Sequence, residues 1–482
     1  MRERPVSTCA AMVLALALSA VSAAPAQEVM WGGTTERNMV GDATDVPTSW
    51  DVETGENILW STPLGSQTYG GPLIMGDKIF VGTNNQGLRN PKLTGDRGVI
   101  MAFSKTDGAF LWQATHTKLP AGRVNDWPQQ GICSTPYIDG DRLFYISNQG
   151  QVVCIDVEGF LDGENDGLIT DEVNRTEIDS DVVWSLDMIE ELNVFPHNLA
   201  TCSPVGAGDL LFVTTSNVVD EGHVLVPSPY APSFLAVSKS TGEVVWEDAS
   251  PGLDILHGQW SNPSYGVIDG EPQVIFPGGD GWVYSFEPET GQLLWKFDCN
   301  PKDSVWELGG RGTRNNLIST PVIYGDHVYL GVGQDPEHGE GSGHLWAIDA
   351  TGRGDITETG ALWHLGDKNY NRTMSTVAIH DGLLYTADLS GFVYCLDLET
   401  GEKKWTYDTF AAIWGSPFVV DGKVYIGDED GEVTILQAGP ELKVIAEILM
   451  ESAIYTTPVA EDGVLYIASR NTLYAIGSAE AH

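Results

Sequence analysis

Arginine, histidine and tryptophan residues are concentrated in several short polar segments of this chain. These segments are "NVFPHNLATC" from Asn193, "ILHGQWSN" from Ile255, "GGRGTRNNLI" from Gly309, "NYNRTMS" from Asn369 and "AAIWGS" from Ala411. Guanidinium groups bind carboxylate or phosphate oxygens through paired hydrogen bonds, and aromatic rings offer a flat surface to a planar or sugar-like body. Brought together, they would form a site for a small anionic or planar ligand. The candidate ligand-binding residues are His197, His257, Trp260, Arg311, Arg314, Arg372 and Trp414. The alternative is structural, with the polar groups satisfying backbone atoms and the tryptophans filling apolar gaps.

Two acidic segments have residue types that bind metal ions. "DGENDGLITDEV" (162–173) places Asp162, Glu164 and Asp166 at calcium-loop positions 1, 3 and 5, but position 12 is valine instead of glutamate. An acidic surface loop is the favoured interpretation. In "GQDPEHGEGSGH" (333–344) the possible ligands lack the spacing of a helical zinc motif, so a solvated loop is again favoured. The possible ligands are Asp335, Glu337, His338, Glu340 and His344.

The elements that must position these residues are revealed by an internal repeat. "SKTDGAFLW" ending at Trp112, "EPETGQLLW" at Trp295 and "DLETGEKKW" at Trp405 share a turn glycine and a final tryptophan. A fixed repeat of this kind is the signature of a propeller or solenoid. The predicted docking tryptophans, one for each copy including looser ones, are Trp60, Trp112, Trp184, Trp246, Trp295, Trp363 and Trp405. We expect most of them to be buried between neighbouring units.

A second element precedes each tryptophan, as in "STPVIYGDHVYLGV" from Ser319. It consists of a Ser/Thr-Pro-like start, an apolar strand, a Gly/Asp turn and another strand. The eight starts are Gly71, Ser134, Cys202, Ser261, Ser319, Ser375, Gly415 and Thr456. Each unit therefore supplies four short strands, and the sequence predicts an all-β, eight-bladed β-propeller. The last unit has only three strands, so the strand around Trp60 is expected to complete it and close the ring.

The copies resemble the tryptophan-docking repeats of the pyrroloquinoline quinone (PQQ) family of eight-bladed propellers, over roughly residues 45–478. That family includes quinoprotein alcohol dehydrogenases and the propeller subunit of the outer-membrane β-barrel assembly machinery. The resemblance makes PQQ and Ca²⁺ possible cofactors, although the residues themselves indicate none. The dehydrogenases carry two adjacent cysteines, and this sequence has no Cys-Cys pair. The resemblance thus supports the fold more strongly than a particular activity.

Insertions and inter-blade links are expected on one face of the ring. Long insertions separate the second and third strands of the first, third and fifth units. In an antiparallel blade of four strands, that loop opens on the same side as the link to the next blade. The candidate ligand-binding residues are therefore expected around the mouth of the central funnel, where a concave site could form.

The amino terminus, charge and cysteines indicate the compartment. Arg2 and Arg4 precede an apolar run that ends in Ala24-Pro25-Ala26, so residues 1–26 are predicted to be a secretory signal peptide and 27–482 a single propeller domain. No cysteine follows the run as a lipid-anchor site would require, and no later segment is apolar enough to span a bilayer. The net charge of −42 disfavours nucleic acid as a partner. Cys154 and Cys395 are expected to be buried thiols. For Cys133 and Cys202 the sequence leaves two alternatives, a disulfide between them or two free thiols.

Taken together, these observations predict a periplasmic or secreted propeller that acts as a binding or scaffold module with a ligand site on the funnel face. Its partner would be a protein or a small ligand, and the chain a monomer or a subunit of a periplasmic assembly. A PQQ-dependent dehydrogenase with a divergent site is the alternative.

Overall fold

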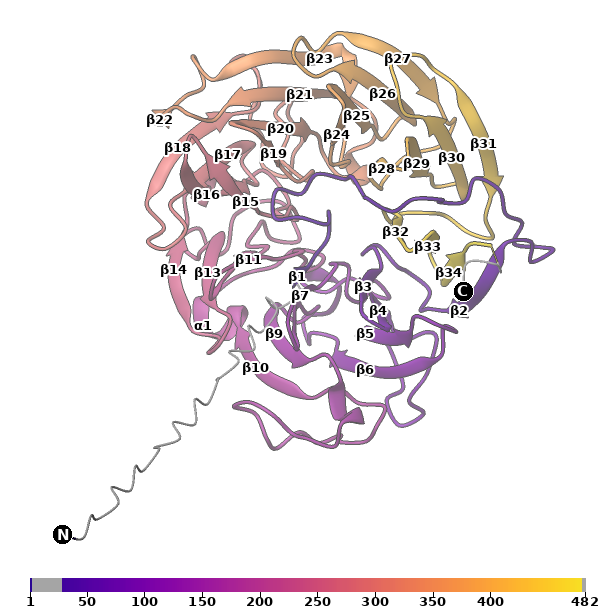
Figure 1. Ribbon diagram of the computed structural model, residues 1–482. Helices are drawn as coiled ribbons and strands as arrows, with labels where there is room; N and C mark the ends of the chain where they lie inside the picture. Colours follow the sequence, from indigo (N-terminus) through magenta and orange to yellow (C-terminus); the bar gives the residue numbers. More distant parts are fainter. Residues whose placement is uncertain (2–27, 479–482) are drawn as a thin grey trace.

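The computed structural model describes Met1 and residues 28–478, whose strands form eight antiparallel sheets arranged in a ring (Figure 1). The predicted signal peptide lies outside the described residues. Each sheet is one blade and has four core strands, in chain order from the axis outward. Blade one contains β3 (Leu73–Met75), β4 (Lys78–Asn84), β5 (Arg97–Ser104) and β6 (Phe110–Thr117), and blade two contains β7 (Tyr137–Asp139), β8 (Arg142–Ile146), β9 (Gln151–Asp156) and β10 (Val182–Asp187). Blade three contains β11 (Val205–Ala207), β12 (Leu210–Thr214), β13 (Phe234–Ser238) and β14 (Val244–Asp248). Blade four contains β15 (Ser264–Ile268), β16 (Glu271–Pro277), β17 (Trp282–Phe286) and β18 (Leu293–Asp298).

Blades five to eight complete the ring and confirm the predicted closure. Blade five contains β19 (Val322–Tyr324), β20 (His327–Val332), β21 (Ser342–Asp349) and β23 (Ala361–Asn371), and blade six contains β24 (Ala378–His380), β25 (Leu383–Ala387), β26 (Phe392–Asp397) and β27 (Lys403–Asp408). Blade seven contains β28 (Phe418–Val420), β29 (Lys423–Gly427), β30 (Glu432–Gln437) and β31 (Val444–Leu449). Blade eight contains β32 (Val459–Glu461), β33 (Val464–Ala468), β34 (Thr472–Ile476) and β2 (Ile58–Pro63). In blade eight, β2 pairs antiparallel with β34, with Trp60 opposite Ala475. The outer strand of the last blade therefore comes from the start of the chain, which leaves no open end in the ring.

Two short strands, one α-helix and several 3-10 helices lie outside this pattern. Strand β1 (Glu28–Val29) pairs with β7, and β22 (Gly354–Asp355) pairs in parallel with β18. The single α-helix found in the described residues, α1 (Met188–Leu192), begins at Asp187, whose carboxylate accepts hydrogen bonds from the next turn. Neither this helix nor any other in the described part of the chain is long and apolar enough to cross a membrane.

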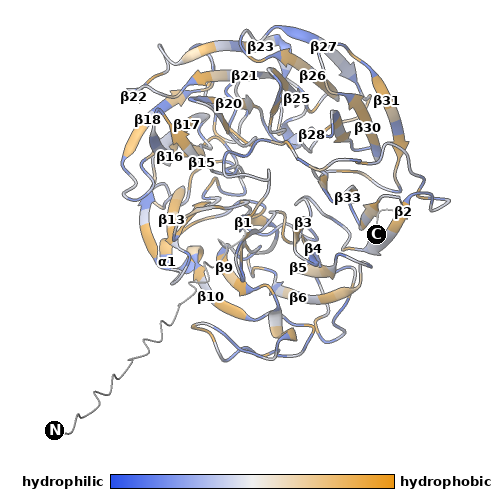
Figure 2. Ribbon diagram, in the orientation of Figure 1, coloured by the Kyte–Doolittle hydropathy of each residue, from blue (hydrophilic) through white to orange (hydrophobic). Residues whose placement is uncertain are grey.

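The core lies between the blades. Figure 2 shows hydrophobic residues along the strands and more hydrophilic ones in the connecting loops. Valine, isoleucine and aromatic side chains of neighbouring sheets pack face to face, because an isolated four-stranded sheet cannot bury both of its faces. Cys154 and Cys395 are buried free thiols in this core, as predicted. Cys133 and Cys202 are also free, so the disulfide that the sequence left open is absent from the structure.

The docking tryptophans join consecutive blades, and most of them are buried, as predicted. Trp184 of blade two donates its indole hydrogen bond to the Lys239 carbonyl in the outer turn of blade three, at 2.9 Å. The corresponding bonds of Trp60, Trp246, Trp363 and Trp405 measure 2.7–3.0 Å. Trp295 differs, because its indole bonds to Gln273 in its own blade. Five of the seven indoles therefore fasten one sheet to the next through a hydrogen bond.

A strap formed by residues 28–57 crosses the ring and was not anticipated from the sequence. In Figure 1 it is the indigo segment that crosses the centre. Tyr265 and Ile323 donate backbone hydrogen bonds to Thr35 and Glu36 of the strap, and Val419 bonds to it as well. Fully buried Arg37 anchors the strap by donating to the carbonyls of Trp31, Ser203, Pro204 and Pro263. Burial lowers the pKa of Arg37 to about 10, so this guanidinium is a cation bound by carbonyl dipoles.

Candidate functional site

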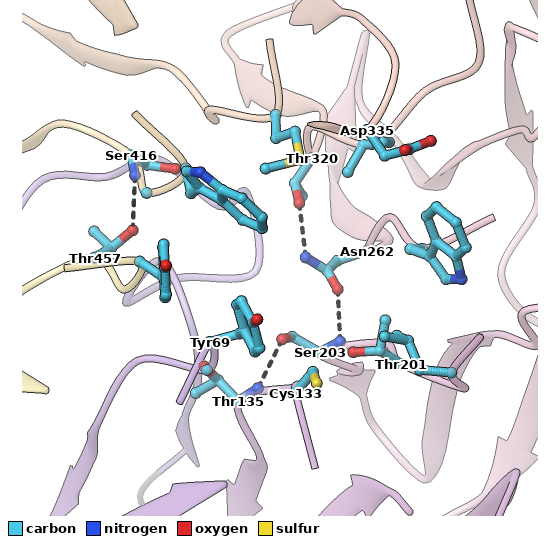
Figure 3. Close-up of a pocket in the computed structure, with 18 of the residues that line it drawn as sticks. Tyr69, Cys133, Thr135, Thr201, Ser203, Asn262, Thr320, Asp335, Ser416 and Thr457 are labelled. Atoms are coloured by element: carbon cyan, nitrogen blue, oxygen red, sulfur yellow. Dashed lines mark hydrogen bonds between the residues drawn. The ribbon is translucent and has the colours of Figure 1, made fainter. Parts of the chain in front are cut away.

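A hydrogen-bonded belt surrounds the axis where the innermost strands begin. In six of the eight blades, the residue after the Ser/Thr-like start bonds to the next blade: Thr135 N–H donates to Ser203 Oγ (3.0 Å), and Asn262 Nδ2 donates to Thr320 Oγ1 (2.9 Å). Figure 3 shows four of these bonds. The belt continues through Thr376, Ser416 and Thr457. The Ser/Thr-Pro pattern of the sequence thus closes the inner rim of the propeller with neutral polar groups.

A cavity of about 350 Å³ lies at the axis within this belt. Aromatic residues from six different segments wall it, and Figure 3 shows Tyr69 facing the space between the blades. These aromatic residues are Trp31, Tyr69, Trp127, Trp260, Trp414 and Tyr455. Tyr69 stacks on Tyr455 with ring centroids 5.2 Å apart. The indole N–H groups of Trp260 and Trp414 are buried without a hydrogen-bond partner among the described residues. The cavity is therefore flat-walled, with two unpaired donors in its aromatic lining.

The predicted arginines do not line this cavity. Arg314 forms an ion pair with Asp298 at 2.7 Å and also donates to the Asp280 carbonyl. Arg372 donates to the Asn315 amide oxygen and the His338 carbonyl, and Arg311 is exposed on the link before blade five. The charged side chains that do line the cavity are Asp335 and Glu337. Of the seven candidates, Trp260 and Trp414 line the cavity, and the arginines serve as structural donors or lie outside it. The expected cationic wall is thus corrected to an aromatic and mildly acidic one.

His197 and His257 belong instead to an imidazole cluster beside the cavity. His197 precedes β11, His257 precedes β15, and His223 lies in the insertion between β12 and β13. The three ring centroids are 4.7–5.0 Å apart. The Nε2 atoms of His197 and His223 are 3.2 Å apart. Two links and one insertion thus meet at one point, on the face where such segments were expected. His197 and His257 were predicted from the sequence, but His223 was not, because its only signal was its place in that insertion.

The insertion of blade five completes the cluster. Its short 3-10 helix η4 (Pro336–His338) begins after Asp335, which accepts hydrogen bonds from His257 Nδ1 (2.9 Å) and His338 Nδ1 (3.0 Å). Burial raises the pKa of Asp335, but these two histidines outweigh burial and hold it well below its usual range. His338 Nε2 donates to the Gly309 carbonyl at 2.7 Å. Burial lowers the pKa of His338, yet the hydrogen bond to Asp335 outweighs burial and raises it. The contact between Asp335 and His338 therefore favours the charged form of both groups.

Two imidazoles of the cluster, those of His197 and His223, are uncharged at neutral pH. Burial, then the neighbouring His257 and His223, lowers the pKa of His197 to about 4. Burial and His257 also lower the pKa of His223. A neutral imidazole offers one nitrogen lone pair, which is the form that binds a metal ion.

The two acidic segments have different outcomes. In the first, Asp166 pairs with Arg142 at 2.8 Å, and Asp162 accepts a hydrogen bond from the backbone of Glu164. These carboxylates are not among the groups of three possible ligands that the described residues bring together. In the second, Asp335 and His338 do group with a third residue, which is His257 of another blade. His344 contacts His364 and takes no part in that group.

The resemblance made PQQ a possible cofactor, but the residues that line the cavity do not fit it. PQQ is a planar tricarboxylate, and three carboxylates need cationic or multiple hydrogen-bond donors. The described cavity lining contains carboxylates and no arginine or lysine. The aromatic walls suit a planar ring, but the charge of the lining disfavours this one.

Comparisons with known proteins agree with the repeat. The family described as outer membrane protein assembly factor BamB matches residues 92–160, 170–353 and 279–439, together more than half of the chain. The dehydrogenase subunit of a quinone-type alcohol dehydrogenase from Gluconobacter oxydans is 26% identical over 37% of this chain and 30% of its own length. BamB from Escherichia coli is 24% identical over 42% of this chain and 47% of its own length.

The chain thus spans less than half the length of these curated relatives. Among solved structures, BamB from Moraxella catarrhalis superimposes with a TM-score of 0.54 at 16% identity, covering 88% of this chain and 97% of that one. This likeness extends the agreement in fold to almost the whole ring. With its eight blades and its repeated tryptophans, the chain belongs to the PQQ-repeat propeller family described as outer membrane protein assembly factor BamB.

Proposed function

We propose that this propeller is a periplasmic or secreted binding and scaffold protein whose axial cavity holds a planar or sugar-like group of its ligand. The observation that carries the proposal is the aromatic wall of the cavity with the unpaired indole donors of Trp260 and Trp414. A buried donor without a partner costs free energy, and an acceptor on a ligand would satisfy it. Relatives named for outer membrane assembly support a scaffold role for the family.

The charge of the lining selects among ligands. Asp335 and Glu337 contribute carboxylates, and the belt contributes neutral hydroxyl and amide groups. Carboxylates in a concave site repel anions and attract cations. The cavity therefore favours a neutral sugar or a cationic aromatic group over the anionic ligand that the sequence analysis expected. In a protein partner, a side chain that combines a ring with hydrogen-bonding capacity has the same chemistry.

Calorimetric titration with three probes tests this proposal: maltotriose for a neutral sugar, tryptamine for a cationic ring and PQQ for an anionic ring. We expect maltotriose or tryptamine to bind more tightly than PQQ. The Trp414→Ala variant should lose this binding, because it removes one aromatic wall. Trp306→Ala is the matched control, since Trp306 is exposed in a loop and its indole bonds to the Asp254 carbonyl. Binding that survives in Trp414→Ala places the site elsewhere.

A PQQ-dependent dehydrogenase is the second candidate, favoured by the similarity to the Gluconobacter enzyme. The same titration separates the two, because a dehydrogenase would bind PQQ most tightly in the presence of Ca²⁺. Dye-linked alcohol oxidation by the reconstituted protein would establish this candidate, and its absence together with sugar or amine binding would support the scaffold.

Export is tested separately. The predicted signal peptide implies cleavage after Ala26 and recovery of the protein outside the cytoplasm. Amino-terminal sequencing of the fractionated protein should begin at Gln27. A cytoplasmic protein with residues 1–26 intact would refute the location while leaving the cavity proposal untouched.

A further inference from the structure

We propose that the Nε2 atoms of His197, His223 and His257 bind one divalent transition-metal ion of the zinc type. The site lies beside the axial cavity, whose lining includes Asp335, and its three ligands need none of the chemistry proposed there. It draws its ligands from the link before blade three, the insertion of blade three and the link before blade four. One nitrogen of each imidazole lies within 4.8 Å of a nitrogen in each of the other two.

The spacing of the first two ligands matches a metal-bound pair. Zinc–nitrogen bonds of about 2.0–2.1 Å at a tetrahedral angle put two nitrogens about 3.4 Å apart. The Nε2 atoms of His197 and His223 are 3.2 Å apart. Without a metal, this contact is a single hydrogen bond between two imidazoles, which explains their approach but leaves His257 out.

The third ligand, His257, has an unsatisfied nitrogen. His257 is fully buried, and its Nε2 has no hydrogen-bond partner among the described residues. Its Nδ1 bonds to the Asp335 carboxylate, so in the neutral ring the proton is on Nδ1 and the lone pair is on Nε2. A buried acceptor without a donor is costly, and a cation would satisfy it. A metal ion thus accounts for both the imidazole contact and the unpaired nitrogen.

Asp335 positions the imidazole of His257. A metal-binding histidine usually donates its other N–H to a carboxylate, which fixes the ring and its tautomer. Asp335 does this for His257 and is itself held by His338. The alternative group of His257, Asp335 and His338 is saturated, because Asp335 accepts from both rings and His338 Nε2 bonds to Gly309. We therefore assign Asp335 and His338 to the support of the site and not to its ligands.

The loops hold the imidazoles in place. His223 has a left-handed backbone with φ 51°, stabilised because the Asp220 carboxylate accepts from Val224 and Leu225. Gly309 lies directly against its ring, where an added Cβ would be 2.8 Å from His223 Cβ. Three imidazoles without a thiolate favour Zn²⁺, Ni²⁺, Cu²⁺ or Co²⁺ over Ca²⁺ and Mg²⁺. Three protein ligands also leave a fourth position for solvent or another ligand.

Competition titration of the chelator-stripped full chain with Zn²⁺, against a chromophoric chelator, tests the site. An excess of Mg²⁺ is included because this acidic surface binds divalent ions through carboxylates, which Mg²⁺ also prefers. We expect one tightly bound Zn²⁺ per chain. Saturating levels of Mg²⁺ that abolish all Zn²⁺ binding, or the absence of a stoichiometric site, would overturn the proposal.

Variants then assign the ligands. His223→Ala should weaken Zn²⁺ binding at least 100-fold, and Asp335→Asn should weaken it about 10- to 100-fold because the ligand ring loses its anchor. His380→Ala is the matched control, since His380 lies on blade six and pairs with the exposed Asp381. Unchanged binding in His223→Ala, or an equal loss in His380→Ala, refutes the assignment.

A spectroscopic measurement needs no variant. Co²⁺ bound by three imidazoles and solvent gives the intense visible absorption of a four-coordinate ion, whereas Co²⁺ on surface carboxylates gives the weak absorption of a six-coordinate one. The first spectrum, displaced by one equivalent of Zn²⁺, is the expected result. The second spectrum alone would refute the site even if His223→Ala failed to fold.

Discussion

Gly242→Ala is the sharpest test of how the blades are held together. Gly242 lies in the outer turn of blade three with φ 76°, directly under the indole of Trp184 from blade two. A Cβ at this position would lie 2.6 Å from Trp184 Cε3 and 2.8 Å from Cδ2. The substitution therefore strains the backbone and also forces the docked ring away from its turn.

A matched control separates these two effects. Gly208 lies in another turn of the same blade with φ 56°, and a Cβ there would meet nothing within 4 Å. Gly208→Ala should cost only the left-handed backbone term of about 1–2 kcal/mol. Gly242→Ala adds the displacement of a packed ring, about 1–3 kcal/mol. The total expected loss in the free energy of unfolding is about 2–5 kcal/mol.

Urea unfolding of both variants, followed by far-ultraviolet circular dichroism, measures the difference. The double variant Trp184→Ala/Gly242→Ala isolates the contact, because removal of the ring relieves the clash. We expect it to be more stable than the sum of the two single losses predicts, by about 1–3 kcal/mol. Equal losses for Gly242→Ala and Gly208→Ala, or additive losses in the double variant, would show that docking on the turn does not stabilise the ring.

Three further expectations follow from the same structure. Deletion of 58–63 removes the outer strand of blade eight, so the truncated protein should aggregate through the exposed edge of β34, as light scattering would show. Trp295→Ala should lower the free energy of unfolding by about 3–5 kcal/mol but leave probe binding in the axial cavity unchanged by calorimetry, because its fully buried ring packs between blades. Burial raises the pKa of Asp280 to about 6, although the hydrogen bond from Tyr284 opposes this rise. The contribution of Asp280 to the free energy of unfolding is therefore complete below about pH 4 and is lost as pH rises through 6. Asp280→Asn should remove about 3 kcal/mol of this pH-dependent loss in unfolding titrations, and an unchanged pH profile would contradict the prediction.

The ring was predictable because the repeat puts the same residue types at the same structural position. The turn glycine and tryptophan recur in register, and five of the seven indoles lie against a glycine in the outer turn of the next blade. The three-stranded last unit and the unassigned strand around Trp60 also indicated the closure before the pairing of β2 with β34 was seen. Local turn chemistry and strand patterning were sufficient here, because every blade solves the same packing problem.

The strap was not predictable by the same reasoning. It bonds to the inner strands mainly through backbone groups, which leave no side-chain pattern in the sequence. Its one conspicuous side chain, Arg37, is bound by carbonyls far away along the chain. The arginines of the links were misassigned for a related reason. Sequence shows that a guanidinium is present, but not that Asp298 lies 2.7 Å from Arg314 to neutralise it.

The histidine cluster shows where a repeat protein departs from its own pattern. The belt residues occupy equivalent positions in successive blades and bond to one another, so these positions already have internal partners. The cluster comes instead from links and insertions that have no equivalent in other blades. His257 Nε2, in one of these links, has no partner in the repeat's bonding scheme. The proposed ligands are separated by 26 and 34 positions along the chain, and they meet because the loops of neighbouring blades lie on one face of the ring. The position of a residue relative to the repeat therefore predicts its place in such a site better than its spacing from the other ligands does.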